Sequence, residues 1–159
     1  MDSTAPISYK DALRKIEHFC AYQERCHQEV ETKLYSYKLS NQEIAEAIAY
    51  LIANNYLNEE RFACLFAISK FHQKNWGRNR ISQELKQRKI SSYLITKGLK
   101  EIPSYEYSET FELISRRFWD SLTEKNSLKK RKKFCDYLLR KGWESDWIYE
   151  KVTELEKRS

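Results

Sequence analysis

The stretch "ISQELKQRKISSYLITKGLKEI" at residues 81–102 decides the fold, because its apolar pattern occurs three times along the chain. A shift of 51 residues places "EVETKLYSYKLSNQEIAEAIAYLI" (29–52) over it, and a further shift of 53 residues adds "KFCDYLLRKGWESDWIYEKVTEL" (133–155). The aligned apolar residues are Val30, Ile81 and Phe134; Leu34, Leu85 and Leu138; Leu39, Ile90 and Trp143; Ile44, Ile95 and Ile148; Ile48, Leu99 and Val152; and Leu51, Ile102 and Leu155. Self-similarity at a fixed period is typical of stacked structural repeats.

Each copy of the pattern predicts two helices joined by a short link. Ser40 and Ser91 occupy the same place in two of the copies, where a hydroxyl can cap the second helix. Ser40 and Glu43 together have the spacing of a capping box. In the third copy Gly142 lies just past the first helix, where the backbone often turns left-handed.

A further amphipathic helix precedes each pair, at about residues 9–22, 58–73 and 104–122. Asn58 is a suitable N-cap for the second of these helices, and Pro103 directly precedes the third. The residues at helical spacing that we expect to face the core are Leu13, Ile16, Cys20, Phe62, Leu65, Phe66, Ser69, Phe111, Ile114, Phe118 and Trp119. The unit that repeats therefore consists of three helices.

These patterns predict an all-α protein of three tandem three-helix repeats, at residues 1–55, 56–103 and 104–159. Because short helices cannot bury their apolar faces alone, we expect the repeats to stack into an elongated, curved array. With 3 Gly and 2 Pro the chain is poor in turn residues, which argues against sandwiches and barrels. The aromatic stripes are more typical of core packing than of a cofactor site.

Charge is distributed unevenly over the three repeats. Residues 1–51 hold 6 basic and 8 acidic side chains, residues 52–103 hold 10 and 4, and residues 104–159 hold 13 and 11. The net charges are thus −2, +6 and +2, which add up to the formal net charge of +6. An acidic first repeat and a basic second one favour a polyanionic partner, or a partner surface of mixed charge.

Membrane and metal sites are not indicated. No segment reaches the uncharged apolar length that spans a bilayer, and the N-terminus lacks a signal pattern, so we expect a cytoplasmic protein without membrane contact. Cys20, Cys26, Cys64 and Cys135 are scattered without a Cys-x-x-Cys pair. Cys20, Cys26 and His27 with a distant fourth group form one conceivable metal site, but reduced thiols acting as small apolar side chains are the more common case. We expect no metal and no cofactor.

Catalytic motifs are also missing from the sequence. It contains no Gly-rich phosphate loop, no His-Glu-x-x-His motif, and no Ser or Cys with a base at a recognised spacing. The paired carboxylates Glu59 and Glu60 lie at a predicted helix start, where acids complement the helix dipole without any chemistry. We therefore expect a protein that is not an enzyme.

The stretch "KNWGRNRISQELKQRKIS" (74–91) concentrates positive charge on one turn and one helix. On a helix from about Asn79 to Lys89, Ile81 and Leu85 point inward, and Arg80 and Lys86 point outward with Lys74 and Arg78 in the preceding turn. Such a surface could contact phosphates or acidic side chains, with Trp76 stacked on a base or a partner residue. The alternative is a solvated basic helix with Trp76 folded into the core. "KKRKK" (129–133) has the same two interpretations.

The segment "YLIANNYLNEERFACLFAISKFHQKNWGRNRISQELKQRKISSYLI" (50–95) resembles the central signature of the RecX family, bacterial regulators of the RecA recombinase. The residues that carry the resemblance are Leu51, Tyr56-Leu57-Asn58-Glu59-Glu60, Arg61-Phe62-Ala63, Lys74 through Gly77-Arg78, and Ile81-x-x-Glu84-Leu85. The tandem three-helix repeats of that family agree with the 51- and 53-residue shifts found above.

The resemblance implies a non-enzymatic, monomeric modulator in DNA repair, recombination and SOS control. It would bind the RecA filament on single-stranded DNA, lie along the filament groove, and suppress ATPase, strand-exchange and coprotease activity. The residues expected to contact RecA or DNA are Lys70, Lys74, Trp76, Arg78, Arg80, Lys86, Arg88, Lys89, Lys129, Lys132, Lys133 and Arg140. A stand-alone DNA- or RNA-binding protein of helix-turn-helix type is the alternative, followed by a helical scaffold.

Overall fold

The computed structural model describes residues 7–158, and in this range the chain forms nine α-helices and no strand. The helices are α1 (Tyr9–Tyr22), α2 (His27–Ser36), α3 (Asn41–Ala53), α4 (Glu59–Lys74), α5 (Arg78–Gln87), α6 (Ser92–Leu99), α7 (Ser104–Ser121), α8 (Ser127–Lys141) and α9 (Ser145–Arg158). None of the helices in the described range is long and apolar enough to cross a membrane.

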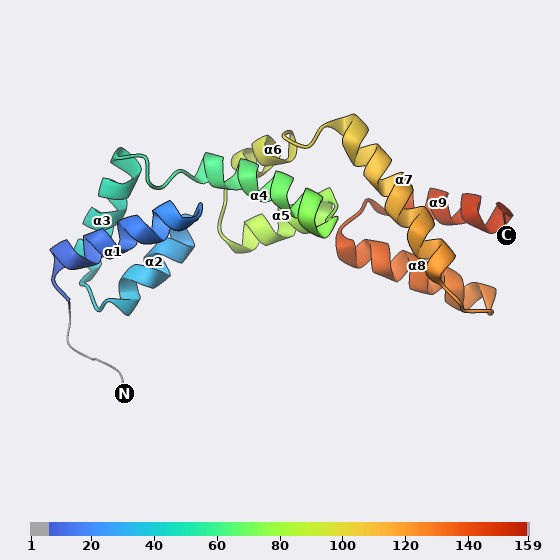
Figure 1. Cartoon of the computed structure of the whole chain (residues 1–159), viewed down its shortest axis with the longest axis horizontal. Helices are drawn as coiled ribbons and strands as arrows, with labels where there is room; N and C mark the ends of the chain where they lie inside the picture. The colour runs from blue at the N-terminus through green and yellow to red at the C-terminus, as the bar shows by residue number, and fades with distance from the viewer. Residues whose placement is uncertain (1–6, 159) are drawn as a thin grey trace.

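The helices pack in three groups that follow one another along the molecule (Figure 1). Within α1–α3, within α4–α6 and within α7–α9, each helix contacts the other two. The groups lie in a row, with α1–α3 and α7–α9 at opposite ends of an elongated, gently bowed particle (Figure 1). The predicted all-α array is thereby confirmed. We call the groups unit 1, unit 2 and unit 3, and we propose the sequence-derived repeat boundaries as their limits.

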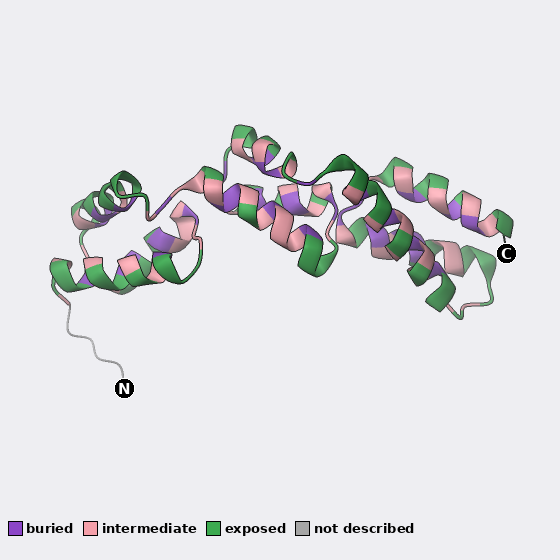
Figure 2. Ribbon diagram, turned by 45° about the horizontal axis from the view of Figure 1, so that its top comes forward, coloured by how far each residue is buried: buried purple, intermediate pink, exposed green. Residues whose placement is uncertain are grey.

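The residues aligned by the repeat form the interior of each unit. Fifteen of the eighteen aligned positions are buried, and the three others, Leu39, Ile48 and Leu99, are half-buried. Buried residues lie on the facing sides of the helices within a unit (Figure 2). The clustered buried side chains divide into one cluster of unit 1 with Leu57, and one continuous cluster through units 2 and 3 that also includes Cys26. The sequence period therefore located the core, but not where the core is interrupted.

Helix starts and stops follow the predicted caps. Ser40 and Glu43 form the capping box, and the Ser91 hydroxyl accepts a hydrogen bond from the backbone N–H of Leu94 at 3.3 Å. Gly142 is left-handed, with φ of 95°. Lys38 and Lys89, which occupy the equivalent position in units 1 and 2, each have φ of 61°. This position turns left-handed in all three units, although only one of them has the residue that prefers it.

The predicted core face of α4 is partly wrong. Leu65, expected to be buried, is 48% exposed, whereas Ala63, Ala67 and Phe71 are buried. The helix presents its alanines inward because α6 lies along them, and small side chains allow two helices to approach closely. Leu65 lies half a turn away from Ala63 and therefore faces solvent.

Units 2 and 3 meet through their backbones. The Gly77 N–H donates to the carbonyl of Lys141 at 2.8 Å, and the Asn79 N–H donates to the carbonyl of Gly142 at 2.9 Å. A Cβ atom on Gly77 would lie 2.4 Å from the Gly142 oxygen, which is closer than real Cβ contacts come. Only a residue without a side chain allows this approach.

Aromatic residues of unit 3 fill the space beside this contact. Trp143 is fully buried, and its indole N–H donates to the carbonyl of Asn75 at 3.1 Å. The ring of Tyr107 lies 4.4 Å from that of Trp143, and its hydroxyl donates to Glu144 at 2.6 Å. Burial, with the bond to Glu144, raises the pKa of Tyr107. The junction between units 2 and 3 thus contains fully buried aromatic side chains.

We expect Leu85→Ala to destabilise the protein by about 2–5 kcal/mol, because this fully buried side chain leaves a cavity when it is truncated. Gln83→Ala, on the exposed side of the same helix, should change stability by less than about 0.5 kcal/mol. Urea unfolding followed by circular dichroism measures both. Equal effects would contradict the helical phase.

Gly77→Ala should lower stability by about 1–3 kcal/mol, because its methyl group forces the backbones of units 2 and 3 apart. The matched control is Asn79→Ala in the same turn, whose side chain is exposed. Thermal unfolding compares the two variants. A Gly77→Ala protein as stable as the parent would mean that the glycine contact is not needed.

Candidate functional site

Arg78 joins units 2 and 3 through its half-buried guanidinium. Its guanidinium NH1 lies 2.9 Å from Glu144 Oε2 and stacks 3.9 Å above the centre of the Tyr107 ring. Its backbone N–H donates to the Tyr107 hydroxyl at 2.9 Å. The sequence placed Arg78 in an outward-facing turn and thus missed its position, because the glycine contact brings the first turn of α5 against unit 3.

Three of the predicted cations lie over two aromatic rings of unit 2. The Arg88 guanidinium is 4.9 Å from the centre of the Phe66 ring, and that of Arg80 is 4.4 Å from the Trp76 ring. The Lys70 ammonium lies 5.5 Å from both rings, whose centres are 6.3 Å apart. We call these five residues the cation–aromatic ridge. Trp76 packs against the core beneath Arg80, so it supports the ridge.

Further contacts fix the arginines of the ridge. Arg88 donates to the Glu84 carboxylate at 3.1 Å and to its carbonyl at 2.8 Å. Arg80 lies 4.0 Å from the other Glu84 oxygen and donates to the carbonyl of Arg140, in unit 3, at 3.1 Å. Glu84 is one carboxylate between two guanidinium groups, so the ridge keeps a net positive charge while its side chains are held in place.

Exposed lysines surround the ridge. Lys74, Lys86 and Lys89 are exposed, and no carboxylate within residues 7–158 forms an ion pair with them. Lys141 was not predicted, yet its ammonium reaches the Lys74 carbonyl at 3.0 Å. Burial, with the charges of Arg80 and Lys74, lowers the pKa of Lys141. Its place directly before the glycine of the α8–α9 link was the only signal in the sequence.

The basic run at the start of α8 forms a separate group. Lys132 pairs with Asp136 at 2.7 Å, Lys133 lies 3.8 Å from Glu124, and Lys129 is exposed. α8 has 15 residues and so extends about 22 Å, and the ridge contacts only its C-terminal end. The twelve predicted contact residues therefore fall into two groups, and much of the second is already paired with acids.

Metal and thiol chemistry have little support in the described part of the chain. No group of three or more His, Cys, Asp and Glu side chains within residues 7–158 could hold a metal ion. Burial raises the pKa of the Cys20 and Cys26 thiols to about 11, so both are protonated at neutral pH. The site is electrostatic in character.

Comparison with known proteins identifies the family. Residues 58–99, which form α4–α6 and carry the ridge, match the model described as RecX, second three-helix domain. The chain is 30% identical over 136 residues to the regulatory protein RecX of Haemophilus influenzae, with 85% of this chain and 88% of that protein covered. This chain belongs to the RecX family. The family is one of regulatory proteins, by the names that its members carry.

Other members differ in length. The chain is 27% identical to RecX of Bacillus cytotoxicus and 26% identical to RecX of Oceanobacillus iheyensis, over 96% and 89% of its own length. It spans only 58% and 54% of those two proteins.

Solved structures of RecX share the fold. The crystal structure of RecX from Lactobacillus salivarius matches 93% of this chain with a TM-score of 0.79 at 22% identity, and covers 96% of its own chain. A second RecX crystal structure matches 92% of this chain with a TM-score of 0.80 at 16% identity, over 71% of its own chain. At these identities the likeness concerns the all-helical fold.

We expect Arg78→Ala to lower the free energy of unfolding by about 1–3 kcal/mol, because Glu144 loses its charged partner in a half-buried place. Lys86→Ala, on the exposed part of α5, should change it by less than about 0.5 kcal/mol. A double-mutant cycle of Arg78→Ala with Glu144→Ala should give a coupling of about 0.5–3 kcal/mol. If the effects of the two substitutions simply add, Arg78 does not depend on Glu144 and the assignment of Arg78 to the boundary is wrong.

Proposed function

We propose that this chain binds the RecA filament on single-stranded DNA and restrains its ATPase, strand-exchange and coprotease activities. Membership of a family of regulatory proteins named RecX supports this role. In this proposal the protein acts in the cytoplasm as a monomer, without catalysis of its own and without a cofactor.

The observation that carries the proposal is the cation–aromatic ridge with its exposed lysines. Aromatic rings hold Lys70, Arg80 and Arg88 in place, so little side-chain freedom is lost when they meet an anion. Lys74 and Lys86 stand beside them without a carboxylate partner in the described range. A surface of fixed cations flanked by unpaired ones suits a polyanion, and it lies in the segment that the family model matches.

The remaining predicted contacts contribute unequally in this proposal. The net charge of −2 in residues 1–51 disfavours contact between unit 1 and phosphates. Lys129, Lys132 and Lys133 at the start of α8 form a second, weaker contact area in the proposal, because ion pairs already neutralise part of their charge. Arg78 is left out, since Glu144 engages its guanidinium.

The double variant Lys74→Glu with Lys86→Glu tests the proposal. Both side chains are exposed, so the fold should persist while binding to a RecA–single-stranded DNA filament and inhibition of its ATP hydrolysis fall sharply. If phosphates are the partner, the dependence of log affinity on log salt should flatten by roughly 0.7–0.9 for each lost contact. If acidic RecA residues are the partner, binding to naked DNA should stay unchanged.

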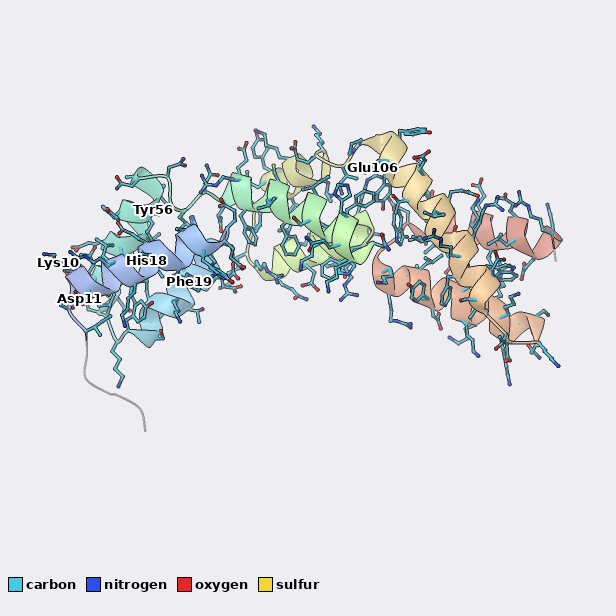
Figure 3. All side chains as sticks on the ribbon, viewed as in Figure 1. Lys10, Asp11, His18, Phe19, Tyr56 and Glu106 are labelled. Carbon is cyan, nitrogen blue, oxygen red and sulfur yellow. The ribbon has the colours of Figure 1, made fainter. Side chains whose placement is uncertain are left out.

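The matched control is Lys10→Glu with Arg14→Glu, which lowers the net charge by the same amount on exposed residues of α1. Lys10 lies at the end of the molecule far from unit 2 (Figure 3). The control should inhibit RecA like the parent. A folded Lys74→Glu, Lys86→Glu protein that inhibits as strongly as the control would refute the assignment. Strong binding to naked DNA without any effect on RecA would favour the alternative of a stand-alone nucleic-acid-binding protein.

A further inference from the structure

The two boundaries between units are built differently. Units 2 and 3 are joined by backbone hydrogen bonds from Gly77 and Asn79 and share one buried cluster. No backbone hydrogen bond within residues 7–158 joins the helices of unit 1 to those of unit 2. Backbone bonds and a common core resist relative motion, whereas side-chain contacts yield more easily.

Side chains make the polar contacts of the first boundary. Arg61 donates from Nε to Glu24 Oε2 at 2.7 Å, and from its terminal nitrogens to the carbonyl and side chain of Asn55 at 3.1 Å. The backbone N–H of His27 donates to Glu59 Oε2 at 3.0 Å. Arg61 therefore connects α4 both to the α1–α2 turn and to the link that precedes its own helix.

A single apolar side chain of unit 1 enters the core of the next unit. Cys26, which is fully buried, belongs to the cluster of units 2 and 3, whereas the other clustered apolar residues of unit 1 belong to a cluster of their own. Leu57, at the end of the link, is anchored in unit 1, and its backbone N–H donates to the Leu51 carbonyl at 3.2 Å. Asn58 already caps α4, so the link between the two units ends where Leu57 meets Asn58. Tyr56 lies on this link (Figure 3).

The boundary between units 1 and 2 leaves one polar atom unsatisfied. Glu24 Oε1 is buried without a hydrogen-bond partner in the described part of the chain. A buried carboxylate oxygen without a partner destabilises the contact between the two units, because separation of the units would return the oxygen to water.

The boundary between units 1 and 2 also places acids beside the cation–aromatic ridge. A groove of about 290 Å³ is lined by Glu24 and Glu29 from unit 1 and by Lys70, Arg88 and Phe66 from the ridge. Carboxylates that line the same groove as cations weaken the attraction of those cations for any other anion.

From these observations we infer that the boundary between units 1 and 2 is an autoinhibitory joint. Closed, it is held by Arg61 and Glu24 and places the acids of unit 1 against the cation–aromatic ridge. Open, it exposes Cys26 and leaves the ridge to a polyanion, while units 2 and 3 move as one body. The joint itself is independent of the RecA proposal, and only the use of the ridge rests on it.

Thiol labelling measures the opening. A chain with Cys26 as its single thiol, the other three being replaced by Ala, is compared with chains that keep only Cys20 or only Cys135, which are buried within a unit. Cys26 is fully buried, so Ellman's reagent reaches its thiol only when the joint opens. We expect Cys26 to react at least roughly tenfold faster than the other two thiols. Equal rates would overturn the joint.

Glu24→Gln tests the closing contact. It should speed the labelling of Cys26 by roughly tenfold, the factor that corresponds to one charge-assisted hydrogen bond, and leave that of Cys135 unchanged. Glu144→Gln removes the same charge at the second boundary and should not affect Cys26. A single-stranded oligonucleotide at low salt, without RecA, should bind the Glu24→Gln chain several-fold more tightly than the Glu144→Gln chain. Faster labelling with equal binding by the two variants would overturn the autoinhibition.

Hydrogen exchange tests the joint on the unmodified chain, so its result does not depend on whether the cysteine variants fold. The amide of His27, which is bonded across the first boundary, should exchange at least roughly tenfold faster than the amides of Gly77 and Asn79 across the second. Equal protection at the two boundaries would contradict the joint, whatever the outcome with RecA.

Discussion

The backbone contact between Gly77 and Gly142 determines which part of α5 is buried against unit 3 and which part is exposed. Because neither residue has a side chain, the start of α5 lies against the α8–α9 link, and the Asn79 N–H reaches the Gly142 carbonyl. Arg78 then lies at the boundary between the two units, where its half-buried guanidinium pairs with Glu144. The later turns of α5 project beyond the contact. One helix can therefore join two units with its first turn and present positive charge with the rest.

Arginines and lysines divide this work according to their chemistry. Arg78, Arg80 and Arg88 stack on aromatic rings and bond to carboxylates or carbonyls, which suits a planar guanidinium with several donors. Lys74 and Lys86 stay exposed, as expected for a strongly hydrated ammonium on a flexible stem. The positive run in the sequence thus contains a structural half and a displayed half, and charge alone does not distinguish them.

The period of the apolar residues predicted the three units, because a buried helical face repeats wherever helices pack in the same way. Caps such as Ser40 and Asn58 were predictable because their bonds are local. The roles of Arg78 and Lys141 were not predictable, since both depend on contacts between residues that lie more than 60 positions apart in the chain and belong to different units. The exposure of Leu65 was missed because packing against α6, rather than hydrophobicity, decides which side of α4 is buried.

The same repeat register accounts for the unequal boundaries. By the shifts of 51 and 53 residues, Cys26 occupies in unit 1 the place of Gly77, and Lys89 occupies in unit 2 the place of Gly142. Side chains at both places keep the backbones of units 1 and 2 apart, so the pair of backbone bonds seen at the second boundary cannot form at the first. Units 1 and 2 are joined by a buried thiol, by the bonds of Arg61 to Glu24 and Asn55, and by the bond from the His27 N–H to the Glu59 carboxylate. The first boundary, which has side chains where the second has glycines, is therefore held through side chains rather than through paired backbones.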